Sequence, residues 1–282
     1  MGLEMMSSFQ RRFDYLSWPD AAKALAGEGA TLVWPFGACE QHGPHLPLAT
    51  DNLFAERLLT KILNELDPDL PIWMLPSQSL GFSPEHQAFP GTISLSSETL
   101  IKLVMEVGKQ LSEFGVKRLI FFNAHGGQIG LLQAAARQLK AVCPEMAIFP
   151  CFVWSGIEQL KELIPGKELE QGLHAGLVET SLMMKLAPEL VGPERPVGGE
   201  QFSEKPQDPP QGWSLEGPAP CAWMTKDLSE NGVIGDCRNA NLTLGTNIER
   251  VLVDHWICLL TNLMRSNWPL LKKPDSQQIN TV

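Results

Sequence analysis

Short apolar runs alternate along this chain with longer amphipathic segments, and this alternation limits the fold most strongly. The short runs are rich in β-branched and aromatic residues over the length of a strand, and the segments between them repeat apolar residues at helical spacing. The predicted strands lie at residues 30–38, 71–76, 116–123 and 146–154, and the predicted helices at 51–66, 96–114, 129–142, 176–186 and 247–264. The alternation predicts an α/β protein with a mainly parallel sheet covered by helices on both faces.

The composition is that of an ordinary soluble globular protein. Of the 282 residues, 44% are hydrophobic and 19% are charged, so we expect a single domain over residues 1–282. The net charge is -10, and the lysines and arginines do not cluster. Because phosphate binding requires grouped cations, we expect no nucleic acid among the partners.

Signs of export or membrane insertion are missing from the sequence. The N-terminal segment has no apolar core like that of a signal peptide, and no apolar run approaches the roughly 20 residues of a membrane span. The six cysteines are scattered, with no C-x-x-C pair, which favours free thiols in a reducing compartment over a thiolate zinc site. We therefore expect a cytoplasmic protein with no membrane partner.

Residues 191–232 differ in character from the rest of the chain. Proline, glycine and polar residues dominate there, and Trp213 and Trp223 are interspersed among them. A loop of this length within a compact domain is usually functional or disordered, and we interpret it as an elaborated loop or lid. The two tryptophans are predicted either to close over a substrate or to form the small core of the lid itself.

The first candidate ligand cluster follows the strand predicted at 30–38. Side chains two positions apart on an extended segment point to the same side, so Glu40 and His42 can face one ion or straddle two. Asp51 follows at a predicted helix start, and a single carboxylate there can bridge two ions. A Glu-x-His pair alone is a weak signal of metal binding, so further ligands from other segments are required.

Three further histidines lie in loops. His125 follows the strand predicted at 116–123 and precedes two glycines, which suits either a ligand or a turn histidine at the start of the next helix. His174 and Glu179 are five residues apart and cannot share one helix face, so we expect His174 on a loop and Glu179 in the first helical turn. Glu179 alternatively is a solvated acid that the helix dipole favours. His86 is a loop residue with a predicted substrate-binding role.

These clusters share one type of ligand set. It combines carboxylates and imidazoles without thiolates, which suits zinc, manganese or iron better than calcium.

Five segments of the chain resemble the creatininase (creatinine amidohydrolase) family. They are FGACEQHGPHLPLATD at 36–51, GFSPEHQAFPGTISL at 81–95, FFNAHGGQ at 121–128, HAGLVETSLMM at 174–184 and GVIGDCRNA at 232–240. The resemblance implies a three-layer α/β/α sandwich, two divalent metal ions, and hydrolysis of a non-peptide C–N bond in a small-molecule substrate such as a cyclic amide or formamide. It also implies a homo-oligomer, with a hexamer as one form.

Individual roles follow from the same resemblance. Glu40, His42, Asp51 and His125 correspond to metal ligands, with Asp51 as the bridge. Creatininase itself looks to have a glutamate at the position that corresponds to Gly127, so this chain departs from creatininase there. The resemblance to relatives with the same glycine implies that Glu179 supplies the missing carboxylate, and the departure disfavours creatinine as the substrate.

His174, which is left without a ligand role, is our candidate for proton transfer to the leaving nitrogen. Two other functions compete with amide hydrolysis of a small molecule. One is a peptidase that acts on a modified peptide, and the other is a non-catalytic scaffold that retains the fold and the metal site.

Overall fold

The computed structural model describes residues 11–198, 209–217, 219–266 and 268. Its centre is a parallel sheet in the order β2-β1-β3-β4. The strands are β1 (Thr31–Phe36), β2 (Ile72–Met74), β3 (Arg118–Asn123) and β4 (Ala147–Phe152), each inside a predicted range. The register pairs the last residues of β1, β3 and β4 with one another, so these three strands end level at one edge of the sheet.

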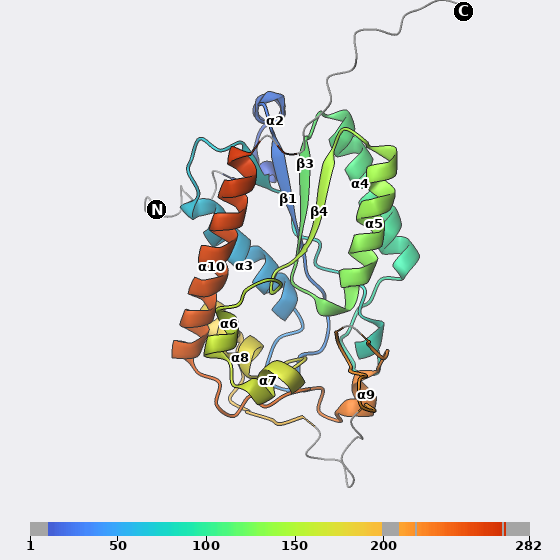
Figure 1. Ribbon diagram of the computed structural model, residues 1–282, viewed down its shortest axis with the longest axis vertical. Coiled ribbons are helices and arrows are strands. Elements are labelled where there is room, and N and C mark those ends of the chain that lie inside the picture. Colours follow the sequence, from blue (N-terminus) through green and yellow to red (C-terminus); the bar gives the residue numbers. More distant parts are fainter. Residues whose placement is uncertain (1–10, 199–208, 218, 267, 269–282) are drawn as a thin grey trace, which may run out of the picture.

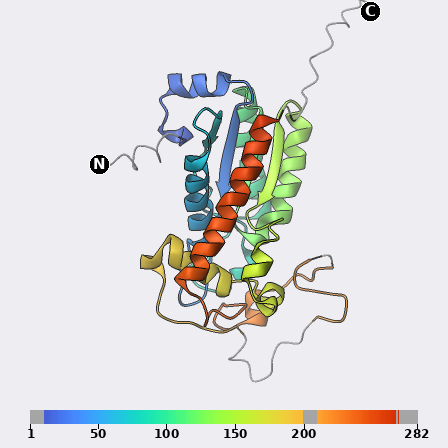
Figure 2. The same cartoon turned by 60° about the vertical axis from the view of Figure 1, so that its left-hand side comes forward.

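Helices cover both faces of the sheet, which confirms the predicted α/β sandwich (Figures 1 and 2). On one face lie α3 (Thr50–Glu65) and α10 (Leu242–Arg265), and on the other lie α4 (Ser97–Glu113) and α5 (Ile129–Val142). A further helix, α2 (Trp18–Ala26), precedes β1 and was not predicted. The start of α10 was wrong, because the helix predicted to begin at about 247 begins at Leu242. The side chain of Asn241 accepts a hydrogen bond from the Leu244 amide and caps the helix earlier.

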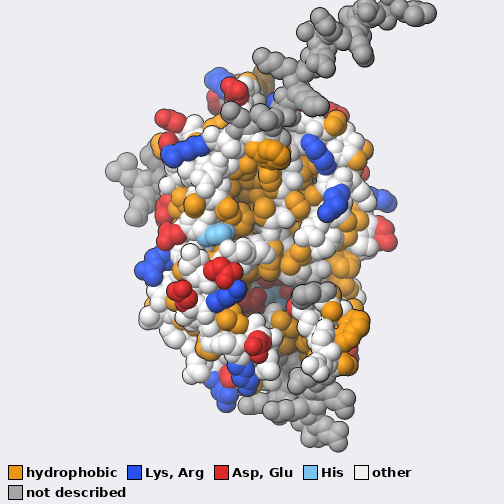
Figure 3. Space-filling view, in the orientation of Figure 1, with side chains coloured by type: hydrophobic (Ala, Val, Ile, Leu, Met, Phe, Trp, Pro, Cys, Tyr) orange, Lys and Arg blue, Asp and Glu red, His pale blue; other side chains and the backbone are white. Residues whose placement is uncertain are grey.

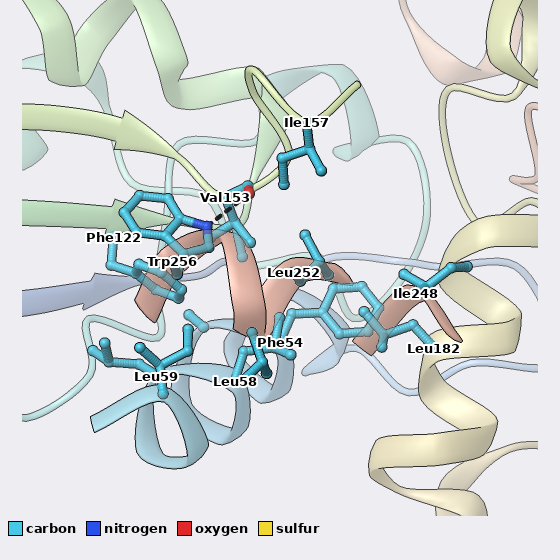
Figure 4. Packing of buried hydrophobic residues seen from close by; sticks show 14 of the residues in the cluster. Phe54, Leu58, Leu59, Phe122, Val153, Ile157, Leu182, Ile248, Leu252 and Trp256 are labelled. Carbon is cyan, nitrogen blue, oxygen red and sulfur yellow. Dashed lines mark hydrogen bonds between the residues drawn. The ribbon is translucent and has the colours of Figure 1, made fainter. Parts of the chain in front are cut away.

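Alternate side chains of the strands build two separate cores. Ile120 and Phe122 of β3 point toward α3 and α10, whereas Leu119 and Phe121 point toward α4 and α5. In the first core, Trp256 of α10 packs edge-on against Phe122, with 4.8 Å between the ring centroids. Its indole nitrogen donates a hydrogen bond to the Val153 carbonyl just beyond β4 (Figure 4). This packing anchors α10 against the end of the sheet from which the site loops emerge.

The carboxyl ends of the strands face one end of the molecule, where short helices and loops gather (Figure 1). These helices are α6 (Leu160–Leu163), α7 (Gly166–Gln171), α8 (Leu177–Leu186) and α9 (Thr225–Leu228). The described part of the predicted lid includes α9 and lies at this end, and its action as a lid stays a prediction. No helix in the described part of the chain is long and apolar enough to cross a membrane.

Candidate metal centre

The five predicted metal ligands come together at the carboxyl end of the sheet. The side-chain ligand atoms of Glu40, Asp51 and His125 lie within 4.8 Å of one another, and so do those of His42, Asp51 and Glu179. Asp51 belongs to both groups, as expected of a residue that bridges two ions. Glu40 and His42 follow β1, Asp51 lies in the first turn of α3, His125 follows β3, and Glu179 lies in the first turn of α8.

Backbone contacts decide which nitrogen of His125 faces this centre. The side chain of Asn123, the last residue of β3, accepts a hydrogen bond from the His125 amide and donates another to the His125 carbonyl. The ring nitrogen Nε2 lies 3.0 Å from the Phe82 carbonyl oxygen, which can only accept, so Nε2 carries the proton. In the neutral ring, Nδ1 then has a free lone pair, and it lies 3.2 Å from Asp51 Oδ2 and 3.3 Å from Glu40 Oε1.

One ring nitrogen of His42 also donates to a backbone carbonyl while the other faces a carboxylate, but the two nitrogens exchange these roles relative to His125. Its Nδ1 donates to the backbone carbonyl of Glu40 at 3.2 Å, so its Nε2 lone pair points at Asp51 Oδ1, 3.3 Å away. In both histidines a nitrogen lone pair thus faces a carboxylate oxygen, an arrangement that requires a cation or a proton between the two atoms.

The hydrogen-bonding of the buried atoms fits a metal centre. Among the described residues, Glu40 Oε2, His42 Nε2 and Asp51 Oδ2 are buried side-chain atoms without a hydrogen-bond partner. These three residues are each at most 2% exposed. Because buried polar groups are almost always paired, unpaired ligand atoms that converge on one place fit a site for divalent cations.

His174 and Glu179 flank the N-terminus of α8 as predicted. His174 lies in the preceding loop, where its backbone forms a two-residue antiparallel bridge with Ile234. Ala175 has a φ of 52°, in the left-handed region, and its amide donates to Glu179 Oε2 at 2.5 Å. This contact turns the carboxylate inward toward His42, so the alternative of a solvated surface acid does not describe Glu179.

The charges in the centre perturb one another strongly. Burial lowers the pKa of His42, but Asp51, Glu179 and Glu40 around it outweigh burial and raise that pKa to about 9. Burial raises the pKa of Glu179 to about 7. For His125 the neighbouring carboxylates also outweigh burial and raise the pKa well above its ordinary value. The acids therefore hold protons on the imidazoles when no metal neutralises them.

A cleft of about 1140 Å³ opens beside the centre. Figure 3 shows a hollow in the lower half of the viewed face, with acidic and histidine side chains inside it. His86, His174 and Trp223 line the cleft, and Trp223 meets the ring of His86 edge-on at 6.2 Å. Trp213 is 60% exposed and is not among the residues of the cleft wall, so the structure brings only one of the two tryptophans to the site. The substrate roles of these residues stay predictions.

Sequence reasoning missed several residues of this site. Glu85 lies beside His86 in a loop that had been singled out, and its Oε1 is 3.6 Å from His125 Nε2. Gln41 lies between two predicted ligands and contacts both His86 and His174. Adjacency to the predicted residues was the available signal for these two. Thr225, which contacts His86 from 139 positions away, gave no such signal.

A family model described as creatinine amidohydrolase matches residues 14–260. The chain belongs to the creatininase family. A mycofactocin precursor peptide peptidase of Mycobacterium tuberculosis is 32% identical over 266 residues, which cover 89% of this chain and 93% of that protein. A creatinine amidohydrolase of Pseudomonas putida is 27% identical over 210 residues, which cover 68% and 78% of the two chains.

Solved creatininase structures share the fold of this family member. A mutant creatininase of the "Zn-Zn type" and a structure described as "Creatininase Mn" each superpose with a TM-score of 0.70 at 22% sequence identity. Each covers 89% of this chain and 97% of the other. The predicted family and fold are confirmed, and the protein is a hydrolase of the creatininase family.

At Gly127, where this chain departs from creatininase, the side chain of a neighbouring loop fills the space beside the glycine. A Cβ atom added at this glycine would lie 1.9 Å from Glu85 Oε1 and 2.8 Å from His125 Nε2. The carboxylate of Glu85 therefore occupies the space that a side chain at position 127 would need. Burial raises the pKa of Glu85, which is consistent with this confined position on the cleft wall.

Proposed function

We propose that this creatininase-family hydrolase binds two divalent metal ions and hydrolyses an amide C–N bond. The observation that carries the proposal is the pair of ligand groups that share Asp51, each with buried lone pairs that lack a partner. Glu40, Asp51 and His125 would hold one ion, and His42, Asp51 and Glu179 the other. Zinc, manganese and iron all suit these ligands.

When bound, the two ions supply a water of lowered pKa and polarise the substrate carbonyl. The residues of the chain then orient the substrate and transfer protons. His174 Nε2 lies 2.6 Å from the Gln41 carbonyl oxygen and donates to it, which leaves Nδ1 unprotonated in the neutral ring, 3.9 Å from Glu40 Oε1. We assign to this nitrogen the acceptance of a proton from the attacking water and the transfer of that proton to the leaving amine.

The size of the cleft bears on the substrate. The sequence favoured a small cyclic amide or formamide, with a modified peptide as the alternative. Pockets for drug-sized ligands have volumes of about 300–1,000 Å³, and a cleft of about 1140 Å³ exceeds that range. One relative with 32% identity is described as a peptide peptidase. The relative favours an amide in a peptide-sized substrate over a molecule of the size of creatinine, and the cleft has room for such a substrate.

The decisive experiment measures metal content and hydrolysis on the same sample. Purified protein loaded with zinc or manganese is offered creatinine, formamidopyrimidines, small lactams and short modified peptides. We expect two ions per chain and turnover of at least one amide class. A sample that binds two ions and hydrolyses none of these amides would support the non-catalytic scaffold instead, and a sample that binds no metal would contradict the proposed metal centre.

Two substitutions separate the two ligand groups. Asp51→Asn removes the shared carboxylate and is expected to abolish binding of both ions, whereas Glu179→Gln is expected to retain one. Glu113→Gln, at an exposed position in the last turn of α4, is the matched control and is expected to bind two. Equal metal content in Asp51→Asn and Glu113→Gln would contradict the bridging role.

The role of His174 has its own test. His174→Ala is expected to retain its metals and to lose turnover, because the ring is outside both ligand groups of the proposal. Near wild-type turnover with metals bound would show that His174 does not transfer the proton. The predicted homo-oligomer and the cytoplasmic location stay predictions, and light scattering of the purified protein tests the first.

A further inference from the structure

The side chain of Gln41 is held in one orientation by two backbone groups. Its Oε1 accepts a hydrogen bond from the Gly43 amide at 2.9 Å, and its Nε2 donates to the Gly232 carbonyl at 3.0 Å. A backbone N–H can only donate and a carbonyl can only accept, so the reversed amide would make two repulsive contacts. Gln41 is 5% exposed, and water cannot readily relieve such contacts. The position of its amide nitrogen is therefore fixed.

This nitrogen determines the protonation of His86. Nδ1 of His86 lies 2.9 Å from Gln41 Nε2, and the hydroxyl of Thr225 lies 2.7 Å from the same ring nitrogen. Because Gln41 Nε2 is a donor, Nδ1 must accept, and the neutral ring carries its proton on Nε2. Nε2 lies 3.5 Å from Glu40 Oε1, and His86 lines the cleft. His86 thus presents an N–H group at the metal centre.

The backbone of the same glutamine determines the protonation of His174. Its carbonyl oxygen accepts from His174 Nε2 at 2.6 Å, so the free nitrogen of His174 is an unprotonated Nδ1, 3.9 Å from Glu40 Oε1. The rings of His86 and His174 lie face to face, with centroids 4.1 Å apart and an angle of 30° between the planes. Both rings are protonated on Nε2, yet they present opposite ends to Glu40: His86 a donor and His174 an acceptor.

We propose that Gln41 is a positioning residue that fixes both rings, and that His86 donates a hydrogen bond to the substrate carbonyl oxygen. The second part rests on the proposed amide hydrolysis, since charge develops on that oxygen during attack by water. The arrangement also argues against a metal bound by Glu40, Glu85 and His86, because the proton on Nε2 occupies the lone pair that an ion would need.

The protonation of His86 is measured without any substrate. The full-length, zinc-loaded protein is labelled with nitrogen-15 at histidine and studied by magic-angle-spinning NMR, with His86 assigned by its loss in His86→Asn. We expect a protonated Nε2 and an unprotonated Nδ1. In Gln41→Glu a carboxylate oxygen replaces the donor, and we expect Nδ1 of His86 to become protonated.

Gln110→Glu is the matched control, because Gln110 makes an exposed hydrogen bond on α4, and its His86 signals should equal those of the wild type. A protonated Nδ1 in the wild type, or an unchanged His86 in Gln41→Glu, would overturn the role of Gln41.

Two substitutions of His86 test its role as a donor. Glutamine places an amide nitrogen near the position of Nε2, whereas asparagine reaches only the depth of Nδ1 and keeps the contact with Gln41. At equal metal content, we expect His86→Asn to lower kcat by about 10²–10³-fold and His86→Gln to retain most of the wild-type rate. Equal losses in the two variants would refute the donor role. If the wild-type protein hydrolyses no amide, the proposed function and the donor role both fail, and the NMR result on Gln41 stands separately.

Discussion

Loading zinc into the metal-free protein should release protons, and the ligands set their number. Burial lowers the pKa values of His42 and His125, but the surrounding carboxylates outweigh it. They raise the pKa of His42 to about 9 and that of His125 well above its ordinary value. Both imidazoles are therefore fully protonated in the metal-free protein at pH 7. Burial raises the pKa of Glu179 to about 7, so this carboxyl is partly protonated at pH 7. Because metal ligands must be deprotonated, we expect about two protons from the histidines and a further fraction of a proton from Glu179.

Isothermal titration calorimetry measures this number. Zinc is titrated at pH 7 in two buffers with different ionisation enthalpies, and the difference between the observed heats gives the protons released per chain. Ionisation of a bound water can only increase the count. Glu179→Gln should lower this number by less than one proton, whereas the control Glu113→Gln should leave it unchanged. Release of fewer than about one proton would refute the assignment of His42 and His125 as ligands.

Three further predictions follow from individual residues. The raised pKa of His42 stabilises the metal-free protein fully below pH 6.5, and this stabilisation is lost as the pH rises through about 9. The difference in the free energy of urea unfolding between the wild type and the control His42→Gln should therefore be smaller at high pH. Gly127→Ala should displace Glu85 and weaken zinc binding by about 10–100-fold, measured by competition with a chelator, without unfolding the protein. Gly245→Ala places a Cβ 1.8 Å from the Ser181 carbonyl oxygen, where α10 crosses α8, and should destabilise the fold by about 1–3 kcal/mol in thermal unfolding; an unchanged Tm would contradict this packing.

The sequence predicted the frame of the molecule and, through its resemblance to the creatininase family, the side chains that meet in the candidate metal centre. Apolar periodicity located the four strands and the helices between them because burial on a sheet or against a helix repeats at fixed spacing. Parallel strands end at one edge, so polar residues directly after them, such as Glu40 and His125, meet there even though they are distant in the sequence. The ligand role of Glu179 followed from the resemblance to the creatininase family, since its place in the first turn of a helix was equally compatible with a solvated acid.

The tertiary structure decided how these side chains are used. Which nitrogen of His42, His86 or His174 faces the centre depends on single hydrogen bonds to Gln41, Thr225 and backbone carbonyls. Such contacts join segments with no common periodicity, so no pattern along the chain reports them. The sequence determined which elements form and where polar residues leave them, since hydrophobic burial repeats locally. The donors, the acceptors and the shape of the cleft were decided only when distant loops met, because hydrogen bonds depend on the position of individual atoms.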